Sequence, residues 1–579
     1  MSWRISLVSG FLVAFGLASS TQAAEIHVPH DRPTIQAGIA ASSNGDTVIV
    51  APGRYVENID FLGKAITVRS TNPDDPSVVS ATIIDGGRKK HCVLFGTGET
   101  GASVIAGFTI TNGKPTESSG HVMGGGISCW GSSPTIMKNR ITGNSATAGS
   151  GIYCERSHAT IVDNEISDGQ GSAVGLSSSD TLFSRNRVLR NSGDAIYAID
   201  WRADRSLKPV IEGNEIADNG GRAYSGTPYL YAALIGNLIR GNADGMYNCW
   251  GPVIDNMIIG NGCGRGIITV GQSEYPIAGN TIVGNNGLSV LSTDHGATIL
   301  RNTIAFNKGG TAAVYCWDGR AVVSGNLIVG NDLSGWEFGS AIFVSSPHGT
   351  TIAGNTVVAN ISGSSGAAIS CYWSDARARL MNNIIYGNLG PSGAQLASRA
   401  DLGFLILSFC TVQGGKAAVF ALEPDTVIWG PGNIDADPRF VDPGHWDDNG
   451  TPADPADDKF ITGDYHLLPG SPCIDAGTND VDDPDTPEVE TLPATDFAGI
   501  RRVIDGNLDG TATVDMGAYE YLPGDVNYDG KVNVLDLLNV RNSMGRDPAS
   551  SPAARKADLN ADGRVDVPDL IAARNALQR

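Results

Sequence analysis

Polar and aliphatic positions recur in a fixed order through the middle of the chain. A six-residue phrase, Asn-x-Ile-x-x-Asn in its full form and with Val for Ile in two copies, recurs in eleven places at a mean spacing of about 24 residues. Ten copies carry the second Asn, and Gly169 replaces it in the other. The leading asparagines are Asn139, Asn164, Asn186, Asn214, Asn237, Asn256, Asn280, Asn302, Asn326, Asn355 and Asn383.

Short runs of alternating apolar and polar residues, with glycine-rich turns, separate the copies, as at residues 124–130 and 312–319. Alternation is typical of strands, and a repeat of this length is typical of a solenoid whose coils bury their apolar faces by stacking. Coils in register lie roughly 4.8 Å apart. We therefore expect an internal ladder of the aliphatic residues two places after each leading Asn. The stacked asparagines are interpreted as structural rather than functional.

The repeat and the segment before it resemble the right-handed parallel β-helix of the pectin-lyase-like superfamily. Residues 33–70 are similar to the amino-terminal cap and first coils of that group. The pattern of Gly53, Tyr55 and Glu57 also occurs in its pectin methylesterase branch, but the downstream catalytic signatures of that branch are missing from the sequence. The resemblance implies an all-β, right-handed parallel β-helix solenoid and does not carry over the esterase activity.

Composition narrows the function classes. The 40 basic and 61 acidic residues give a formal charge of −21, which argues against nucleic acid or an anionic membrane as a partner. Arg4, the apolar residues 5–18, and Thr21 with Ala23 have the pattern of a signal peptide spanning residues 1–23. The apolar stretch is shorter than the ~20 residues of a membrane span. We therefore expect a protein that is secreted, extracellular or on the cell surface, without membrane insertion.

Nine cysteines are too few for disulfides to be the main source of order in an exported protein of this size. Cys129 and Cys154 each lie ten residues before their Asn, so we expect them to stack inside neighbouring coils, with Cys316 in the same column. One coil spacing also fits a disulfide. The sequence leaves both interpretations open and favours a ladder of buried thiols.

The phrase is absent after about residue 403, where an acidic, proline-rich segment begins. Residues 404–523 resemble the tail that closes many secreted bacterial β-helix proteins. Within it, Asp505, Asn507 and Asp509 with Gly510 have the opening of a calcium loop, but Met516 stands where a twelfth-position acid is needed. We interpret this stretch as a turn.

Two segments near the carboxyl terminus, beginning at residues 525 and 558, align over 20 residues at an offset of 33. Each has oxygen ligands at loop positions 1, 3, 5, 9 and 12, a backbone carbonyl at position 7, and Gly at position 6, which is the spacing of a Ca²⁺ loop. The expected ligands are Asp525, Asn527, Asp529, Lys531, Asn533 and Asp536 in the first loop, and Asp558, Asn560, Asp562, Arg564, Asp566 and Asp569 in the second.

Asp at position 12 and a single helix after each loop resemble a type I dockerin over residues 524–579, a small α-helical module with paired EF-hand-like loops. The resemblance implies Ca²⁺ binding and a cohesin domain of a scaffold or cell-surface protein as partner. Positions 10 and 11 are Val534 and Leu535, then Val567 and Pro568, which depart from the hydroxyl pairs of familiar dockerins. The identity of the cohesin is therefore open, and a calcium-stabilised cap without a cohesin partner is the alternative.

The turn eight to ten residues before each leading Asn carries aromatic and charged residues that we expect to point outward. Such a row suits a sugar polymer, because rings stack on pyranose faces and charged groups bind hydroxyls or carboxylates. The expected substrate-binding residues are Trp130, Trp317, Arg320, Trp373, His295, Arg202 and Arg205.

Asp294 and Asp318 both lie eight residues before their Asn in consecutive coils, so their carboxylates are expected roughly 5 Å apart, as in a retaining glycosidase. Both precede turn-forming residues, and plain Asx turns are the alternative. A lyase would instead use the basic cluster of Arg202, Arg205 and Lys208. These residues favour a polysaccharide-acting protein, either a glycoside hydrolase or a polysaccharide lyase, with residues 24–403 as the β-helix. The alternative is a non-catalytic glycan-binding or adhesion protein.

Overall fold

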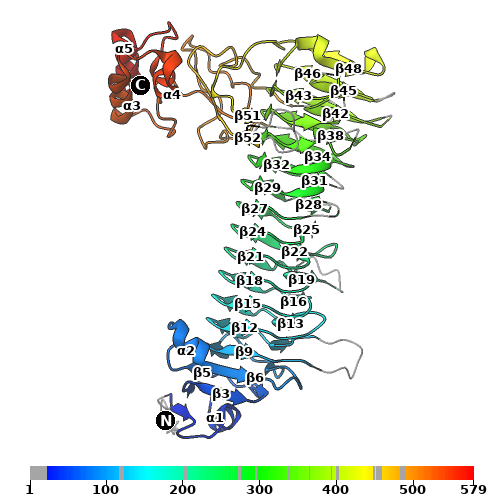
Figure 1. Ribbon diagram of the computed structural model, residues 1–579, viewed down its shortest axis with the longest axis vertical. Coiled ribbons are helices and arrows are strands. Elements are labelled where there is room, and N and C mark those ends of the chain that lie inside the picture. The colour runs from blue at the N-terminus through cyan, green and yellow to red at the C-terminus, as the bar shows by residue number, and fades with distance from the viewer. Residues whose placement is uncertain are drawn as a thin grey trace, which may run out of the picture.

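A computed structural model describes residues 23–578 except 116–122, 201–205, 263, 265, 272–274, 294–295, 337–338, 364, 374, 393, 400–402, 448–449, 451–458 and 483–490. The described chain winds into a long stack of coils, with its amino terminus at one end and a small helical module beside the other (Figure 1). Most coils contribute one strand to each of three parallel sheets, which we call sheets A, B and C, and two of the later coils contribute two strands to sheet C.

Sheet A precedes the first Asn of each phrase, sheet B lies between the two Asn positions, and sheet C completes the coil. The strands of sheet A are β1 (Glu25–Val28), β2 (Thr47–Val50), β5 (Thr67–Ser70), β8 (Val104–Ala106), β11 (Thr135–Met137), β14 (Thr160–Val162), β17 (Leu182–Ser184), β20 (Val210–Glu212), β23 (Ala233–Ile235), β26 (Val253–Ile254), β29 (Pro276–Ala278), β32 (Thr298–Leu300), β35 (Ala321–Ser324), β39 (Thr350–Ala353), β43 (Arg377–Met381), β46 (Phe404–Ser408) and β49 (Val427–Trp429).

The strands of sheet B are β3 (Gly53–Val56), β6 (Thr82–Asp85), β9 (Thr109–Thr111), β12 (Arg140–Thr142), β15 (Glu165–Ser167), β18 (Arg187–Leu189), β21 (Glu215–Ala217), β24 (Leu238–Arg240), β27 (Met257–Ile259), β30 (Thr281–Val283), β33 (Thr303–Ala305), β36 (Leu327–Val329), β40 (Thr356–Val358), β44 (Ile384–Tyr386) and β47 (Thr411–Val412).

The strands of sheet C are β4 (Ile59–Asp60), β7 (Val93–Phe95), β10 (Ile127–Trp130), β13 (Ile152–Glu155), β16 (Val174–Ser177), β19 (Ile196–Ile199), β22 (Arg222–Ser225), β25 (Asp244–Cys249), β28 (Gly266–Val270), β31 (Asn286–Thr293), β34 (Lys308–Cys316), β37 (Asp332–Leu333), β38 (Ser340–Val344), β41 (Ile361–Ser362), β42 (Ile369–Cys371), β45 (Leu396–Ser398) and β48 (Val419–Ala421). Helices α1 (Ile35–Ala41) and α2 (Pro76–Ala81) accompany the first coils, and η1 (Gly415–Ala418) and η2 (Pro424–Thr426) the last.

The expected internal ladder is confirmed. Ile141 faces Ile166 in register, Ile166 faces Val188, and the residues two places after every other leading Asn are fully buried in the same column. Cys129 and Cys154 also face each other in register, and both are free, buried thiols. Stacking of small and β-branched side chains at one coil spacing therefore forms the core.

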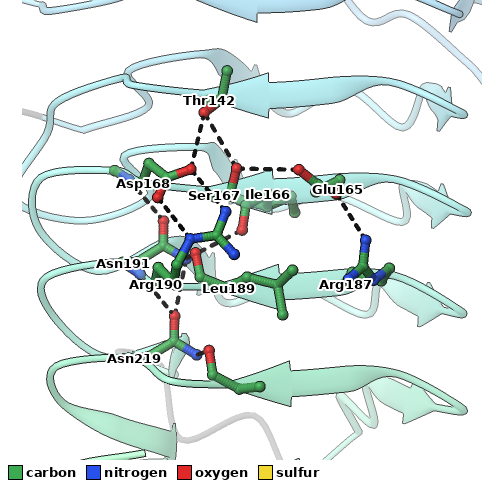
Figure 2. A network of polar contacts seen from close by, with 12 residues as sticks. Thr142, Glu165, Ile166, Ser167, Asp168, Arg187, Leu189, Arg190, Asn191 and Asn219 are labelled. Carbon is green, nitrogen blue, oxygen red and sulfur yellow. Dashed lines mark hydrogen bonds and ion pairs between the residues drawn. The ribbon is translucent and has the colours of Figure 1, made fainter. Parts of the chain in front are cut away.

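The asparagines form two hydrogen-bonded ladders along the coils. Asn302 shows the pattern: its Oδ1 accepts from the backbone N–H and Nδ2 of Asn280, and its Nδ2 donates to Ile277 O and to Asn326 Oδ1. Figure 2 shows the second ladder at Asn191 and Asn219. That ladder is interrupted at Gly169, where a Cβ would lie 2.4 Å from Ser150 Oγ. The structural interpretation of the asparagines is confirmed.

The outer face of sheet B carries ion pairs between neighbouring coils in the amino-terminal half. Arg187 lies 2.9 Å from both Glu165 and Glu215, and Arg190 contacts Asp168 at 3.0 Å (Figure 2). A hollow of about 510 Å³ beside these pairs is lined by Arg187 and Glu165, and by the paired residues Lys138 with Asp74 and Arg185 with Asp163. Its cations and carboxylates pair with one another, so this face is stabilised by its own charges.

The coils continue past residue 403 as far as β49, so the boundary expected at 403 falls inside the solenoid. We call residues 430–522 the C-terminal cap. In it, β50 (Phe440–Asp442) pairs with β53 (Asp464–Leu467), and β51 (His445–Asp447) pairs with β52 (Lys459–Ile461), both antiparallel. The cap folds back over the outer face of sheet B in the last coils, where Phe460 contacts Phe306 with ring centroids 6.1 Å apart.

A buried ion pair fixes the cap to the coils. Arg502 and Glu520 lie 2.9 Å apart with side chains 2% and 1% exposed, and Arg502 Nη2 also donates to Gly517 O and to Gly354 O of the solenoid. Burial raises the pKa of the neighbouring Asp515 carboxyl to about 7. The cap thus contains more carboxylates than cations at its centre.

The helical module follows directly. Helix α3 (Val534–Ser543), η3 (Pro548–Ser550), α4 (Pro552–Ala557) and α5 (Val567–Ala576) surround a small core that includes Val540, Val565 and Ala573. Both α3 and α5 begin with a capping box, formed by Asn533 with Asp536 and by Asp566 with Asp569. In the described part of the chain, no helix has the length and apolar character needed to cross a membrane.

Candidate functional site

Six aromatic residues gather on the outer face and edge of sheet C, over the coils of β34, β38 and β42. We call them the aromatic patch: Tyr315, Trp317, Trp336, Phe343, Tyr372 and Trp373. Phe343 lies at the centre, with ring centroids 5.3 Å from Tyr315, 6.0 Å from Trp336 and 5.7 Å from Tyr372.

The outermost members of the aromatic patch are its tryptophans. Trp317 contacts Tyr315 and Trp373 contacts Tyr372, while Trp317, Trp336 and Trp373 remain 51%, 39% and 53% exposed. Trp373 adopts a φ of 81°, a conformation that bulky residues rarely take. Exposed rings of this size, supported from below by other rings, form a rigid apolar platform on the surface.

A shallow hollow of about 520 Å³ adjoins the aromatic patch at the amino-terminal ends of β31 and β34. Glycine backbone forms much of its lining, and a Cβ on Gly309 would lie 2.2 Å from Gly287 O. Lys308 and Asp332 line it as partners in register. The side chain of Trp336 stands beside it, since a Cβ on Gly310 would lie 3.6 Å from Trp336 Cβ. The hollow therefore adds polar groups and exposed peptide groups to the platform.

An acid–imidazole pair lies at the carboxyl-terminal edge of the same coils. Asp318 Oδ1 is 3.3 Å from His348 Nε2, and both side chains are partly exposed. Asp318 Oδ1 also accepts a hydrogen bond at 2.7 Å from the backbone N–H of Gly319, the next residue, whereas in an Asx turn the N–H two residues on would donate. A carboxylate can orient an imidazole that donates or accepts a proton, so this pair has both a structural and a chemical use.

The predicted site residues are only partly brought together. Trp317 and Trp373 are exposed in the aromatic patch, as expected, and Asp318 and the exposed Arg320 follow Trp317 in the same turn. Trp130 is also exposed, but it lies eight coils away, about 38 Å at the usual coil spacing. Asp294, His295, Arg202 and Arg205 lie outside the described residues, and the carboxylate pair of Asp294 and Asp318 stays a prediction.

Lys208, the third member of the basic cluster expected for a lyase, is exposed but engaged. Its Nζ donates to Tyr275 Oη at 3.1 Å and lies 5.7 Å from the centre of that ring. Asp200, in the same long turn, is buried and accepts a hydrogen bond from Ser178 Oγ. These two residues thus contribute to the packing of the turns.

Sequence reasoning did not join Tyr315, Trp336 and Phe343 to the site, nor did it pair His348 with Asp318. The signal for the pair was present: His348 lies seven residues before Asn355 and Asp318 eight before Asn326, which are neighbours in the asparagine ladder. Counting back from the ladder would have placed the two side chains in adjacent coils.

The two predicted calcium loops have matching hydrogen bonds. Asp525 Oδ2 accepts from Gly530 N at 2.8 Å, and Asp558 Oδ2 accepts from Gly563 N at 2.9 Å. Asp536 and Asp569, the twelfth residues, are almost fully buried, and each accepts backbone N–H groups of its own loop. Burial raises the pKa of Asp525, and the nearby charge of Asp536 raises it further.

The donor set of each loop fits Ca²⁺, because it combines carboxylates, amide oxygens and a backbone carbonyl around a glycine turn. A buried carboxylate such as Asp536 is costly without a compensating cation. Among the described residues, no three His, Cys, Asp or Glu side chains converge closely enough to hold a metal by themselves. The calcium ligands therefore stay predictions.

Family models match two parts of the chain. Residues 80–216 and 202–357 match the model of the right handed beta helix region, and residues 523–578 match the dockerin type I domain. No curated protein sequence matches the chain.

Several solved structures are similar to it at low identity. The pectate lyase Pel9A shares 13% identity at a TM-score of 0.27, with 87% of this chain and 97% of that chain covered. The A-module of the Azotobacter vinelandii mannuronan C-5 epimerase AlgE6 shares 14% at 0.26, covering 70% and 95%. The PL6 family alginate lyase AlyGC shares 14% at 0.27, covering 74% and 55%. The assignment rests on the family models and the observed coils: the chain combines a right-handed parallel β-helix with a C-terminal type I dockerin domain.

Proposed function

We propose that the protein acts on a polysaccharide that lies against the aromatic patch, and that its dockerin tethers it to a cohesin domain outside the cell. The observation that carries the proposal is the platform of exposed Trp317, Trp336 and Trp373 over three coils, next to the hollow lined by Lys308 and Asp332. Stacking on pyranose faces together with hydrogen bonding to hydroxyls is the usual basis of carbohydrate recognition.

Asp318 and His348 are the residues we propose for proton transfer. In a hydrolase, one acid protonates the glycosidic oxygen while a second carboxylate acts on the anomeric carbon, and Asp294 is the predicted second carboxylate. In a lyase, a base removes the proton beside a uronate carboxylate and the glycosidic oxygen leaves as a double bond forms. An imidazole held by Asp318 suits either task, so the products distinguish the two reactions.

The dockerin supplies the tether. Dockerin domains bind calcium, and we propose the twelve predicted loop residues as the ligands here. Helices α3 and α5 expose apolar side chains at equivalent positions, Val534 and Leu538 on one and Val567 and Ile571 on the other. Such exposed apolar positions are typical of a docking surface, and they support a cohesin as partner and an extracellular or cell-surface location.

The test is to incubate the mature chain, in calcium and then in chelator, with neutral and uronic-acid polysaccharides, and to measure new reducing ends and unsaturated products. We expect Asp318→Asn and His348→Ala to lower the rate by about 10²-fold or more. A matched control exists at His158 and Asp180, an acid–imidazole pair 3.8 Å apart on the same edge of earlier coils. His158→Ala and Asp180→Asn should leave the rate unchanged.

Retention of a polysaccharide without any product would favour the non-catalytic glycan-binding or adhesion protein. If no polymer of the panel retained the protein and none yielded a product, the proposal would be contradicted. Equal losses in the His158 and His348 variants would show that the pairs stabilise turns rather than transfer protons.

A further inference from the structure

The dockerin is in direct contact with the C-terminal cap. Helix α4 provides two of the contacts: Arg555 Nη1 donates to Val441 O at 3.1 Å, and Lys556 Nζ donates to Asp464 Oδ2 at 2.8 Å. Val441 and Asp464 belong to the paired strands β50 and β53 of the cap. The module therefore lies against the cap, which stands between it and the last coils (Figure 1).

The first calcium loop provides the third contact. Tyr528, its fourth residue, stacks on His466 with ring centroids 4.6 Å apart and an interplanar angle of 25°. Its hydroxyl donates to Leu467 O at 3.0 Å, and Lys556 Nζ lies 4.6 Å from the centre of its ring. One residue of the predicted metal loop is thus held between α4 and strand β53.

The two loops differ at this position. The equivalent of Tyr528 in the second loop is Ala561, and both residues adopt a left-handed φ, 56° and 57°. Ala561 has no ring or hydroxyl. Its Cβ lies 3.0 Å from the place that a Cβ on Gly470 of the cap would take, and the two residues line a cavity of about 600 Å³ between the second loop and the cap. The hydrogen-bonded and stacked contact with the cap therefore depends on the first loop.

We propose that closure of the first loop on calcium locks the dockerin onto the C-terminal cap, so that this loop stabilises the end of the β-helix as well as its own module. The position of Tyr528 depends on the closed loop, because the bonds from Asp529 N and Gly530 N to Asp525 and from Val526 N to Asp536 fix the backbone on both sides of it. Asp525 and Asp536, which accept these bonds, are also predicted calcium ligands. Without a cation, the three carboxylates of Asp525, Asp529 and Asp536 repel one another and favour an open loop.

The lock leaves the outward sides of the module free for a partner. Val534 on α3 and Val567 on α5 are 60% and 56% exposed while α4 and the first loop hold the cap. A partner that binds α3 or α5 would then hold the β-helix in a fixed orientation. A flexible linker between the dockerin and the cap would instead let the β-helix rotate.

The experiment measures hydrogen exchange of the backbone amides in β50 and β53 of the mature full-length chain, with calcium chloride or with chelator. In the wild type we expect calcium to slow exchange in these strands, by up to about 100-fold at a free concentration of 100 times Kd. Asp525→Ala in the first loop should abolish the effect. Asp558→Ala, the same change at the matching position of the second loop, should preserve more of it.

Tyr528→Ala tests the contact with the cap independently of dockerin folding, because it removes no predicted calcium ligand. We expect this variant to bind calcium at both loops by calorimetry, and to show α3 and α5 protected by calcium, while β50 and β53 no longer respond. Tyr528→Phe keeps the stack on His466 and should retain most of the response. Calcium-independent exchange of β50 and β53 in the wild type would overturn the proposal, and so would a full calcium response in Tyr528→Ala.

Discussion

The asparagine ladder predicts a large and local loss of stability when one rung is removed. In Asn302→Ala, four hydrogen bonds of a fully buried side chain disappear, two accepted from Asn280 and one each donated to Ile277 O and Asn326 Oδ1. At about 1 kcal/mol for each buried hydrogen bond, the cost is about 4 kcal/mol. Asn433→Ala is the matched control, since it ends the same column after Cys410 and is partly exposed. Because Asn433 is partly exposed, water can take the place of its side chain, so we expect a loss of about 1 kcal/mol there.

Native-state hydrogen exchange is the suitable assay, because coils open locally and a single global transition would average over them. A loss of 4 kcal/mol corresponds to nearly three orders of magnitude faster exchange for amides of β30 and β33, the sheet B strands beside this rung. An increase in the exchange rate of these amides below about tenfold, or equal losses of stability in Asn302→Ala and Asn433→Ala, would refute the reasoning that buried amide stacking holds the coils together.

Three further predictions concern buried groups. Burial raises the pKa of Asp515 from 3.8 to about 7, so the folded cap binds the proton more tightly than the unfolded chain and loses stability as the pH rises from about 4 to about 7. In saturating calcium, the cap should therefore unfold at a lower temperature at pH 8 than at pH 5. A higher unfolding temperature at pH 8 would contradict this. Arg502→Ala should destabilise the cap by about 3 to 5 kcal/mol in chemical denaturation because Glu520 is left buried without its partner. Arg185→Ala, which removes an exposed ion pair with Asp163, should leave the denaturation midpoint nearly unchanged. Cys129 and Cys154 should react with a thiol reagent only after unfolding, since both are fully buried, and rapid labelling of the native chain would show that the coils open there.

Much of the fold was predictable from the chain because one short phrase sets the register of every coil. Asn302 and Ile304 recur at the same places in neighbouring coils, and both places are fully buried. The extent of the solenoid was not predictable, because the last coils lack the phrase: Cys410 takes the place of the leading Asn there, and the coils run on to Trp429. The repeat at an offset of 33 predicted one helix after each loop of the dockerin, and these helices are α3 and α5.

The candidate site was only partly predictable because it depends on irregular coils. Trp317 and Trp373 could be placed outward from the alternation around their buried cysteines, Cys316 and Cys371. Trp336 lies in the connection between β37 and β38, within the coil where the spacing of the leading asparagines rises to 29 residues. Such an insertion has no internal pattern, so its contact with Phe343 follows only from the folded coils.

The most direct test of the account is whether a polysaccharide lies on the aromatic patch. Retention of the mature chain in gels containing neutral or uronic-acid polysaccharides would be compared for the wild type, the double variant Trp317→Ala and Trp373→Ala, and Trp130→Ala as a control on a distant coil. We predict that at least one polymer retains the wild type and Trp130→Ala, and that the double variant binds it about 30-fold more weakly, as expected for the loss of two stacked rings at about 1 kcal/mol each. Equal retention of all three proteins, or retention lost only in Trp130→Ala, would contradict the assignment of the aromatic patch as the polysaccharide site.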